Sequence, residues 1–127
     1  MSVSPNDLFM LGQRTLAAHT CEADLRGSMS RLYYSAYHHA RQFSEGLPSQ
    51  GDDSQAKGGV HARLYTALMN PSIPRDNEQF LKSKSLGYML KVMHAQRVKA
   101  DYIIDTEVSI QDAQSMEQQA GNALKKI

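Results

Sequence analysis

Helical spacing of apolar residues is the feature that most restricts the fold of this chain. Apolar side chains recur at three- and four-residue steps in five segments, and no segment alternates apolar and polar residues over several positions. β-branched residues, which favour strands, are sparse. The pattern therefore predicts an all-α fold, a five-helix up-and-down bundle.

Capping signals predict where the outer helices begin. Ser4 is placed as an N-cap before Pro5 at the first helical position, and this helix is expected to end near His19. Ser109 and Asp112 form a capping-box pattern at the start of the last helix. The three helices between them are expected over about residues 22–43, 60–69 and 77–99. The polar stretch 46–59 is the longest expected loop, either mobile or part of a functional surface.

Length and composition limit the class of protein further. The 127 residues are enough for one domain, and 41% hydrophobic with 21% charged residues excludes a disordered chain. A formal net charge of +1 means that any contact with nucleic acid needs a local basic patch. The single cysteine, Cys21, forms no internal disulfide, and the sequence shows no leader and no run of 18 apolar residues. We therefore expect a cytoplasmic protein with no membrane segment.

The second predicted helix carries the polar residues best suited to chemistry. With successive residues 100° apart, the apolar side chains share one face, and Tyr33 and Tyr37 are expected in the core. Arg31 and His38 share the opposite face, about 10 Å apart along the axis. A ligand could sit between them. The same polar stripe contains Ser35 and Gln42, with Tyr34 and Arg41 at its edge.

An arginine and a histidine on one helix face suit the cleavage of RNA through its own ribose hydroxyl. A histidine can act as general base or general acid near neutral pH. The planar guanidinium of an arginine matches phosphate oxygens. Because the substrate supplies the nucleophile, this chemistry needs no metal and no cofactor. The alternative is that Arg31 and His38 are ordinary solvated residues on the polar side of an amphipathic helix.

Two separate motifs resemble the HEPN domain family. The string SMSRLYYSAYHHARQF at 28–43 matches the pattern S-R-x-Y-Y-x-x-[YF]-H-x-A-R of small stand-alone HEPN proteins. RVKADY at 97–102, followed by VSIQDAQSMEQQA at 108–120, resembles the family's R-x-x-A-D-Y turn and final helix. KGGVHARLY at 57–65 is a looser match to the H-K-G-V stretch, with Ala56 in place of the usual histidine. The matches occur in the family's order along nearly the whole chain.

The resemblance implies a single HEPN-like domain over residues 1–127 that forms a homodimer. Its R-x4-6-H motif, here Arg31 and His38, would face the partner subunit in a composite site. Many members are metal-independent endoribonucleases of toxin–antitoxin or antiphage-defence systems that act on RNA, and some are neutralised by a nucleotidyltransferase antitoxin. The nucleotidyltransferase modifies a tyrosine two residues after the motif histidine, and in this chain that position is Ala40. The alternative is a non-catalytic HEPN module that binds nucleotide or RNA, or docks a partner nucleotidyltransferase.

The remaining polar residues receive supporting or structural interpretations. Tyr34, Ser35 and Arg41 are candidates for shaping the site or binding RNA. Asp101 either fixes the turn at the end of the fourth helix or orients Arg31 or His38. His39 is expected to be a half-buried hydrogen-bonding residue. His61 is expected to point into solvent or cap the third helix, His94 is isolated in the sequence, and no His or Cys pair has the spacing of a metal site.

Overall fold

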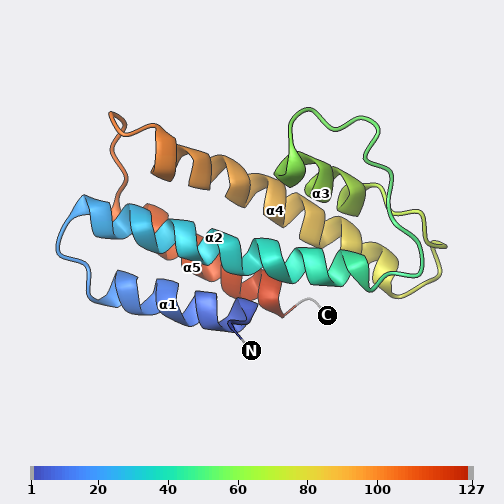
Figure 1. The fold of residues 1–127 in the computed structure, drawn as a ribbon, viewed down its shortest axis with the longest axis horizontal. Helices are drawn as coiled ribbons and strands as arrows, with labels where there is room; N and C mark the ends of the chain where they lie inside the picture. Colours follow the sequence, from blue (N-terminus) through green and yellow to red (C-terminus); the bar gives the residue numbers. More distant parts are fainter. Residues whose placement is uncertain (1, 126–127) are drawn as a thin grey trace.

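The computed structural model describes residues 2–125 of the chain. Within that range it contains five α-helices and no strand, which confirms the predicted all-α class (Figure 1). Across the described residues, no helix combines the length and the apolar character needed to cross a bilayer. The helices are α1 (Pro5–Ala17), α2 (Glu22–Glu45), α3 (Val60–Met69), α4 (Gln79–Tyr102) and α5 (Ile110–Leu124).

The predicted capping residues define the two outer helices. The Ser4 side chain accepts a hydrogen bond from the backbone of Asp7, whose carboxylate accepts one in return from the backbone of Ser4. Ser109 and Asp112 form the same reciprocal pair before α5. Helix α3 has the predicted bounds, whereas α2 and α4 each extend further toward their C-terminal ends than expected.

Helix α2 lies at the centre of the bundle. It packs mainly against α1, α4 and α5, whereas α3 packs mainly against α4, on the outer side of the body formed by the other helices (Figure 1). Apolar residues of α2, α4 and α5 dominate the core. Its most completely buried large side chains are Leu32, Tyr33, Leu68, Leu86, Leu90, Met93 and Met116.

Two glycines allow helices to approach each other closely. A Cβ atom at Gly12 in α1 would lie 2.6 Å from Cγ of Leu32 in α2. A Cβ atom at Gly87 in α4 would lie 2.8 Å from the backbone nitrogen of Met69 and 2.9 Å from the carbonyl oxygen of Tyr65, both in α3. Backbone atoms cannot rotate away as a side-chain end can. The seam between α3 and α4 therefore depends on the absence of a side chain at Gly87.

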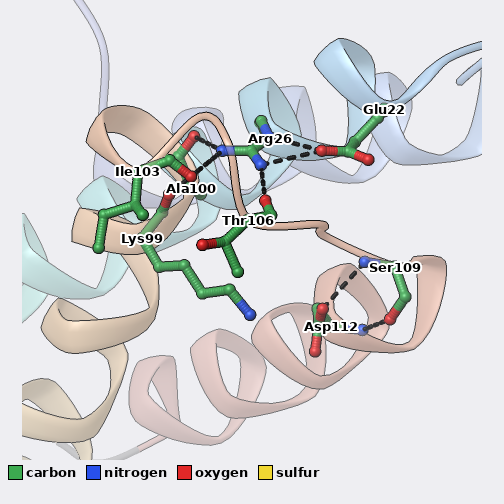
Figure 2. A network of polar contacts seen from close by, with 8 residues as sticks. All are labelled: Glu22, Arg26, Lys99, Ala100, Ile103, Thr106, Ser109 and Asp112. Atoms are coloured by element: carbon green, nitrogen blue, oxygen red, sulfur yellow. Dashed lines mark hydrogen bonds and ion pairs between the residues drawn. The ribbon is translucent and has the colours of Figure 1, made fainter.

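Arg26 in α2 joins the C-terminal end of α4 to the loop that follows it (Figure 2). Its guanidinium donates hydrogen bonds to the carbonyl oxygens of Lys99, Ala100 and Ile103 at 3.0–3.2 Å, and also to that of Thr106. Glu22 holds the other edge of the guanidinium at 2.9 Å. A cation at the end of a helix satisfies carbonyl groups that have no partner within the helix. This contact gives a physical reason for the extension of α4 to Tyr102.

The long loop 46–59 has contacts along its first half. Leu47 is buried, and the Gln50 side chain donates a hydrogen bond of 2.7 Å to the carbonyl oxygen of Ser44. The backbone nitrogen of Asp52 donates to the carbonyl oxygen of Asn70 at 2.9 Å, and Gly51 lies against the carbonyl of Ala67. These contacts join the loop to the C-terminal ends of α2 and α3. Its predicted mobility stays a prediction.

Substitution by alanine should change the stability of the fold in opposite directions at Gly87 in α4 and Gly27 in α2. Gly87→Ala places a Cβ atom against the backbone of α3, so we expect it to lower the free energy of unfolding by about 1–3 kcal/mol. Gly27 is exposed in α2, and a Cβ atom there would have no neighbour within 4 Å outside its own helix turn. Gly27→Ala should therefore raise the free energy of unfolding by up to about 1 kcal/mol. Urea denaturation measures both, and two changes of the same sign would contradict this account.

Candidate functional site

Helix α2 lies between α1 and α4 (Figure 1), and the polar residues on its outward face form a stripe. Arg31 and Arg41 are exposed on it, and Tyr34 and His38 are half-buried between them. Arg41 forms an exposed ion pair of 3.3 Å with Glu45, one turn further on. His38 also lines a shallow hollow beside the start of α1, together with Val3, Pro5, Leu8 and Gln42. Arg31 and His38 therefore lie on the same accessible face, and two guanidinium groups bracket the histidine.

Ser35 does not belong to this stripe, contrary to the prediction. Its side chain is fully buried, and its hydroxyl donates a hydrogen bond of 2.6 Å to the carbonyl oxygen of Leu32 in the preceding turn. Helix α1 abuts Leu32 through Gly12 and borders His38 through Leu8, so Ser35 lies in the stretch that α1 covers. A serine is small enough for this close packing and satisfies its own hydroxyl. Ser35 is a packing residue and has no access to a ligand.

Arg97 in α4 is the main support of the stripe, a role that the sequence pattern did not predict. It is buried, with 8% of its surface exposed, and its Nη2 donates a hydrogen bond of 2.7 Å to the hydroxyl of Tyr34. Its guanidinium lies over the rings of Tyr33, Tyr34 and Tyr102, 5.1–5.7 Å from their centroids. A cation over the faces of aromatic rings is attracted by their electron density. Arg97 therefore fixes the position of Tyr34 at the edge of the stripe.

Asp101 compensates the charge of Arg97 and contacts neither Arg31 nor His38. Its Oδ2 lies 2.9 Å from Nε of Arg97, but the N–H bond is not aimed at it, so the contact is an ion pair without a hydrogen bond. The same oxygen accepts a hydrogen bond of 3.2 Å from the hydroxyl of Ser30 in α2. Of the two interpretations of Asp101, the one in which it orients Arg31 or His38 is therefore wrong. Asp101 acts on the site only through Arg97.

Seven rings from three helices meet beside the stripe and form an aromatic cluster. Tyr33 and Tyr37 are buried within it, as predicted for core residues. Ring centroids of neighbouring members are 4.5–6.2 Å apart. The cluster consists of Tyr33, Tyr34, Tyr37 and His38 from α2, His61 and Tyr65 from α3, and His94 from α4.

The structure corrects the interpretation of His61 and His94. The two imidazoles stack with centroids 5.1 Å apart and an interplanar angle of 19°, and both are half-buried. Nδ1 of His61 shares a hydrogen bond of 2.7 Å with the hydroxyl of Tyr33, so His61 neither points into solvent nor caps α3. The sequence contained one signal for the inward position of these two histidines. His61, Tyr65 and Leu68 are spaced as one helix face, and His94 lies between Leu90 and Arg97 on the inner face of α4.

Burial and neighbouring cations act on the three imidazoles of the cluster. Burial lowers the pKa of His38, and Arg41 lowers it further. Burial also lowers the pKa of His61, with added contributions from His94, Arg97 and His38. The pKa of His94 is lowered by burial and then by Arg97. All three therefore favour the neutral form at neutral pH, in which an imidazole nitrogen can accept a proton.

Neither a metal site nor a similar protein of known function helps to identify the role of this face. Over residues 2–125, no group of three or more His, Cys, Asp or Glu side chains could hold a metal ion. Comparison with protein-family models, curated proteins and solved structures found no match.

Acidification should destabilise the fold through the cluster imidazoles. Because their pKa values in the folded chain lie below the ordinary 6.5, the unfolded chain binds more protons once the pH falls below that value. Their contribution to stability is complete above the ordinary pKa and is lost as the pH falls through the lowered values. His94→Gln removes one of these groups. Between about pH 7.5 and 5.5, the free energy of unfolding of this variant should decrease less than that of the wild type, as measured by urea denaturation. Equal decreases would show that His94 does not contribute.

Proposed function

We propose that the chain is a metal-independent endoribonuclease of the toxin or antiphage-defence type that acts as a homodimer. The observation that carries the proposal is the placement of Arg31 and His38 on one accessible face of α2, with His38 packed against Tyr34 and Tyr37. The resemblance of residues 28–43 and 97–120 to HEPN domains supports it. Arg31 and His38 would be the catalytic residues, Tyr34 and Arg41 would contact the substrate, and no cofactor would take part.

The proposed reaction is cleavage of RNA by its own 2′-hydroxyl. A base removes the proton of that hydroxyl, the 2′-oxygen bonds to phosphorus, and the bond from phosphorus to the 5′-oxygen breaks as an acid protonates the leaving oxygen. The products are a 2′,3′-cyclic phosphate and a 5′-hydroxyl. His38 would serve as base or acid, and Arg31 would stabilise the charge that develops on the phosphate oxygens.

Three features of the stripe support this assignment. The pKa of His38 is lowered from its ordinary value, so its imidazole changes protonation state on the acidic side of 6.5 and can give or take a proton there. Arg31 and Arg41 supply the local positive charge that a chain with a net charge of only +1 needs for binding RNA. Tyr34, held by Arg97, offers a half-buried ring beside the stripe, and aromatic rings stack on unpaired bases.

A homodimer would complete a site that is thin in one subunit. In a two-fold dimer the same surface meets itself, so an interface that includes α2 would bring two copies of Arg31 and His38 together. Tyr102, whose ring lies against Arg97, is 67% exposed, and Ile104 in the loop after α4 is 79% exposed, so an interface could cover both. Tyr37, by contrast, is buried in its own subunit at 6% exposed, so its ring adds no area to an interface.

Substituting either residue of the motif should abolish RNA cleavage without unfolding the chain. His38→Ala is expected to reduce the rate by about 10²–10⁴-fold through loss of proton transfer. Arg31→Ala should reduce it by about 10²–10³-fold through loss of charge stabilisation. The double variant should be scarcely slower than either, because both residues act in one site. Gel analysis of mixed cellular RNA, with EDTA present, measures cleavage and the cyclic phosphate ends.

His39→Gln is the matched control for the His38 variant. His39 is the next residue of α2 and is half-buried outside the stripe, so its substitution should keep most of the activity. Circular dichroism establishes that each variant is folded. If the wild type cuts no RNA, or if His38→Ala cuts as well as the wild type, the ribonuclease assignment fails and the non-catalytic binding module replaces it.

Mixing two inactive variants tests whether the site is shared between subunits. If Arg31 of one subunit acts with His38 of the other, a mixed dimer of Arg31→Ala and His38→Ala chains keeps one intact site. Random exchange makes half of the dimers mixed, so activity should recover to about one quarter of the wild type. No recovery, in a sample that light scattering shows to be dimeric, would place Arg31 and His38 of each site in the same subunit. A monomer at micromolar concentration would contradict the homodimer itself.

A further inference from the structure

The proposed reaction needs two proton transfers, and the motif on α2 supplies one imidazole for them. General acid and general base act at different oxygens of the same phosphodiester, so the site needs two titratable groups. The structure contains a second imidazole next to His38, contributed by α3. This is His61, which the spacing of residues along the chain does not connect with His38 at all.

His38 and His61 flank the same two tyrosine rings. The Tyr37 centroid is 5.2 Å from that of His38 and 4.5 Å from that of His61. The Tyr34 centroid is 6.1 Å from His38 and 5.9 Å from His61. The two imidazoles are close enough for the charge of His38 to affect the titration of His61. Both are half-buried, so part of each residue is accessible to solvent.

The hydroxyl of Tyr33 fixes the orientation of His61. Its oxygen lies 2.7 Å from Nδ1, and burial raises the pKa of Tyr33, so this hydroxyl stays protonated and neutral. In the tautomer in which Nδ1–H donates a hydrogen bond to this hydroxyl, Nε2 keeps its lone pair for proton transfer. An imidazole held at one nitrogen and open at the other is the usual arrangement of a general base. His38, in contrast, has ring contacts with Tyr34 and Tyr37 but no tyrosine hydroxyl bonded to it in the described residues.

The surrounding charges distinguish the two imidazoles. His61 faces His94 and Arg97 on α4 and His38 on α2, and its remaining neighbours are the neutral rings of Tyr33, Tyr34 and Tyr37. Asp101 forms an ion pair with Arg97 and also accepts a hydrogen bond from Ser30. His38 is influenced by one cation, Arg41, which is itself paired with Glu45. More neighbouring groups oppose a charge on His61 than on His38, which favours His38 as the residue that carries a shared proton.

We propose that His61 is the general base of the site and that His38 is its general acid, both from the same subunit. The inference rests on the proposed ribonuclease function. Nε2 of His61 accepts the proton of the 2′-hydroxyl, the 2′-oxygen bonds to phosphorus, the bond to the 5′-oxygen breaks, and protonated His38 donates its proton to that oxygen. After the step His61 carries the proton from the 2′-hydroxyl and His38 has lost its own. Proton exchange with solvent returns the two imidazoles to their starting forms.

Two substrates separate the two roles. The first is a ribodinucleotide, whose 5′-hydroxyl leaving group needs a proton. The second is a ribonucleoside 3′-(4-nitrophenyl phosphate), whose phenolate leaves without one. His61→Gln, which keeps a hydrogen-bonding group for Tyr33, should lower kcat/KM for both substrates by about 10²–10⁴-fold. His38→Gln should lower it to a similar extent for the dinucleotide, but by no more than about tenfold for the nitrophenyl ester.

His19→Gln is the matched control, because His19 lies just beyond α1 and outside the aromatic cluster. Its Nδ1 lies 2.7 Å from the carbonyl oxygen of Leu16. The variant should cleave both substrates at close to the wild-type rate. Circular dichroism and urea denaturation check that all three variants are folded.

The pH dependence of the wild type tests the roles without any substitution. Cleavage of the dinucleotide should follow a bell-shaped profile with its maximum below pH 6.5, because the pKa values of both imidazoles are lowered from 6.5. Cleavage of the nitrophenyl ester should keep only the acidic limb, which reports His61, and reach a plateau at higher pH. An ester profile without an acidic limb would overturn the inference even if His61→Gln does not fold.

The outcomes distinguish this inference from the function beneath it. If the wild type cleaves neither substrate, the ribonuclease proposal fails and the inference falls with it. If the wild type cleaves both and His61→Gln does so equally well, the ribonuclease stands and His61 is not its base. If His38→Gln loses cleavage of both substrates to the same extent and His61→Gln does not, the two roles are reversed and the inference is wrong.

Discussion

The compensation of one buried cation organises the seam between α2 and α4. Transferring a guanidinium from water into a protein interior is costly unless hydrogen bonds and opposite charges replace its hydration. Arg97 meets this requirement with one carboxylate, one phenol hydroxyl and three aromatic rings, all of which come from α2 and α4. Losing Asp101 would leave the tyrosine rings facing an uncompensated charge. The partners are therefore fixed together, and Tyr34 with them.

The positions of the helices follow largely from local chemistry, which is why the sequence predicts them well. Ser4 and Ser109 each have an aspartate three residues later, and the resulting capping boxes need nothing beyond one turn of chain. The ends of α2 and α4 were predicted less well. The extension of α4 involves Arg26, a contact across more than 70 residues that no local pattern reveals (Figure 2).

The candidate site was predictable only in the part that one helix carries. Helical geometry correctly placed Arg31 and His38 on one face, but it could not show that α1 covers Ser35, because that depends on where another helix packs. The partners of Asp101 and the meeting of His61 with His94 likewise depend on tertiary contacts. A polar residue on an inward-facing helix position, such as Arg97 or His94, signals a buried network, but its partners come from the fold.

The outer position of α3 sets a limit on how firmly its residues are held. Helix α3 rests mainly on α4, at Gly87, and is bounded by the loop 46–59 and by residues 70–78, whereas α1, α2, α4 and α5 form a body without it (Figure 1). Segments with few neighbours open on their own, at a lower free energy than the whole domain. Amide hydrogens of α3 would then exchange with solvent earlier than those of α2. His61 would leave the aromatic cluster in such openings while Arg31 and His38 stayed in place on an intact α2.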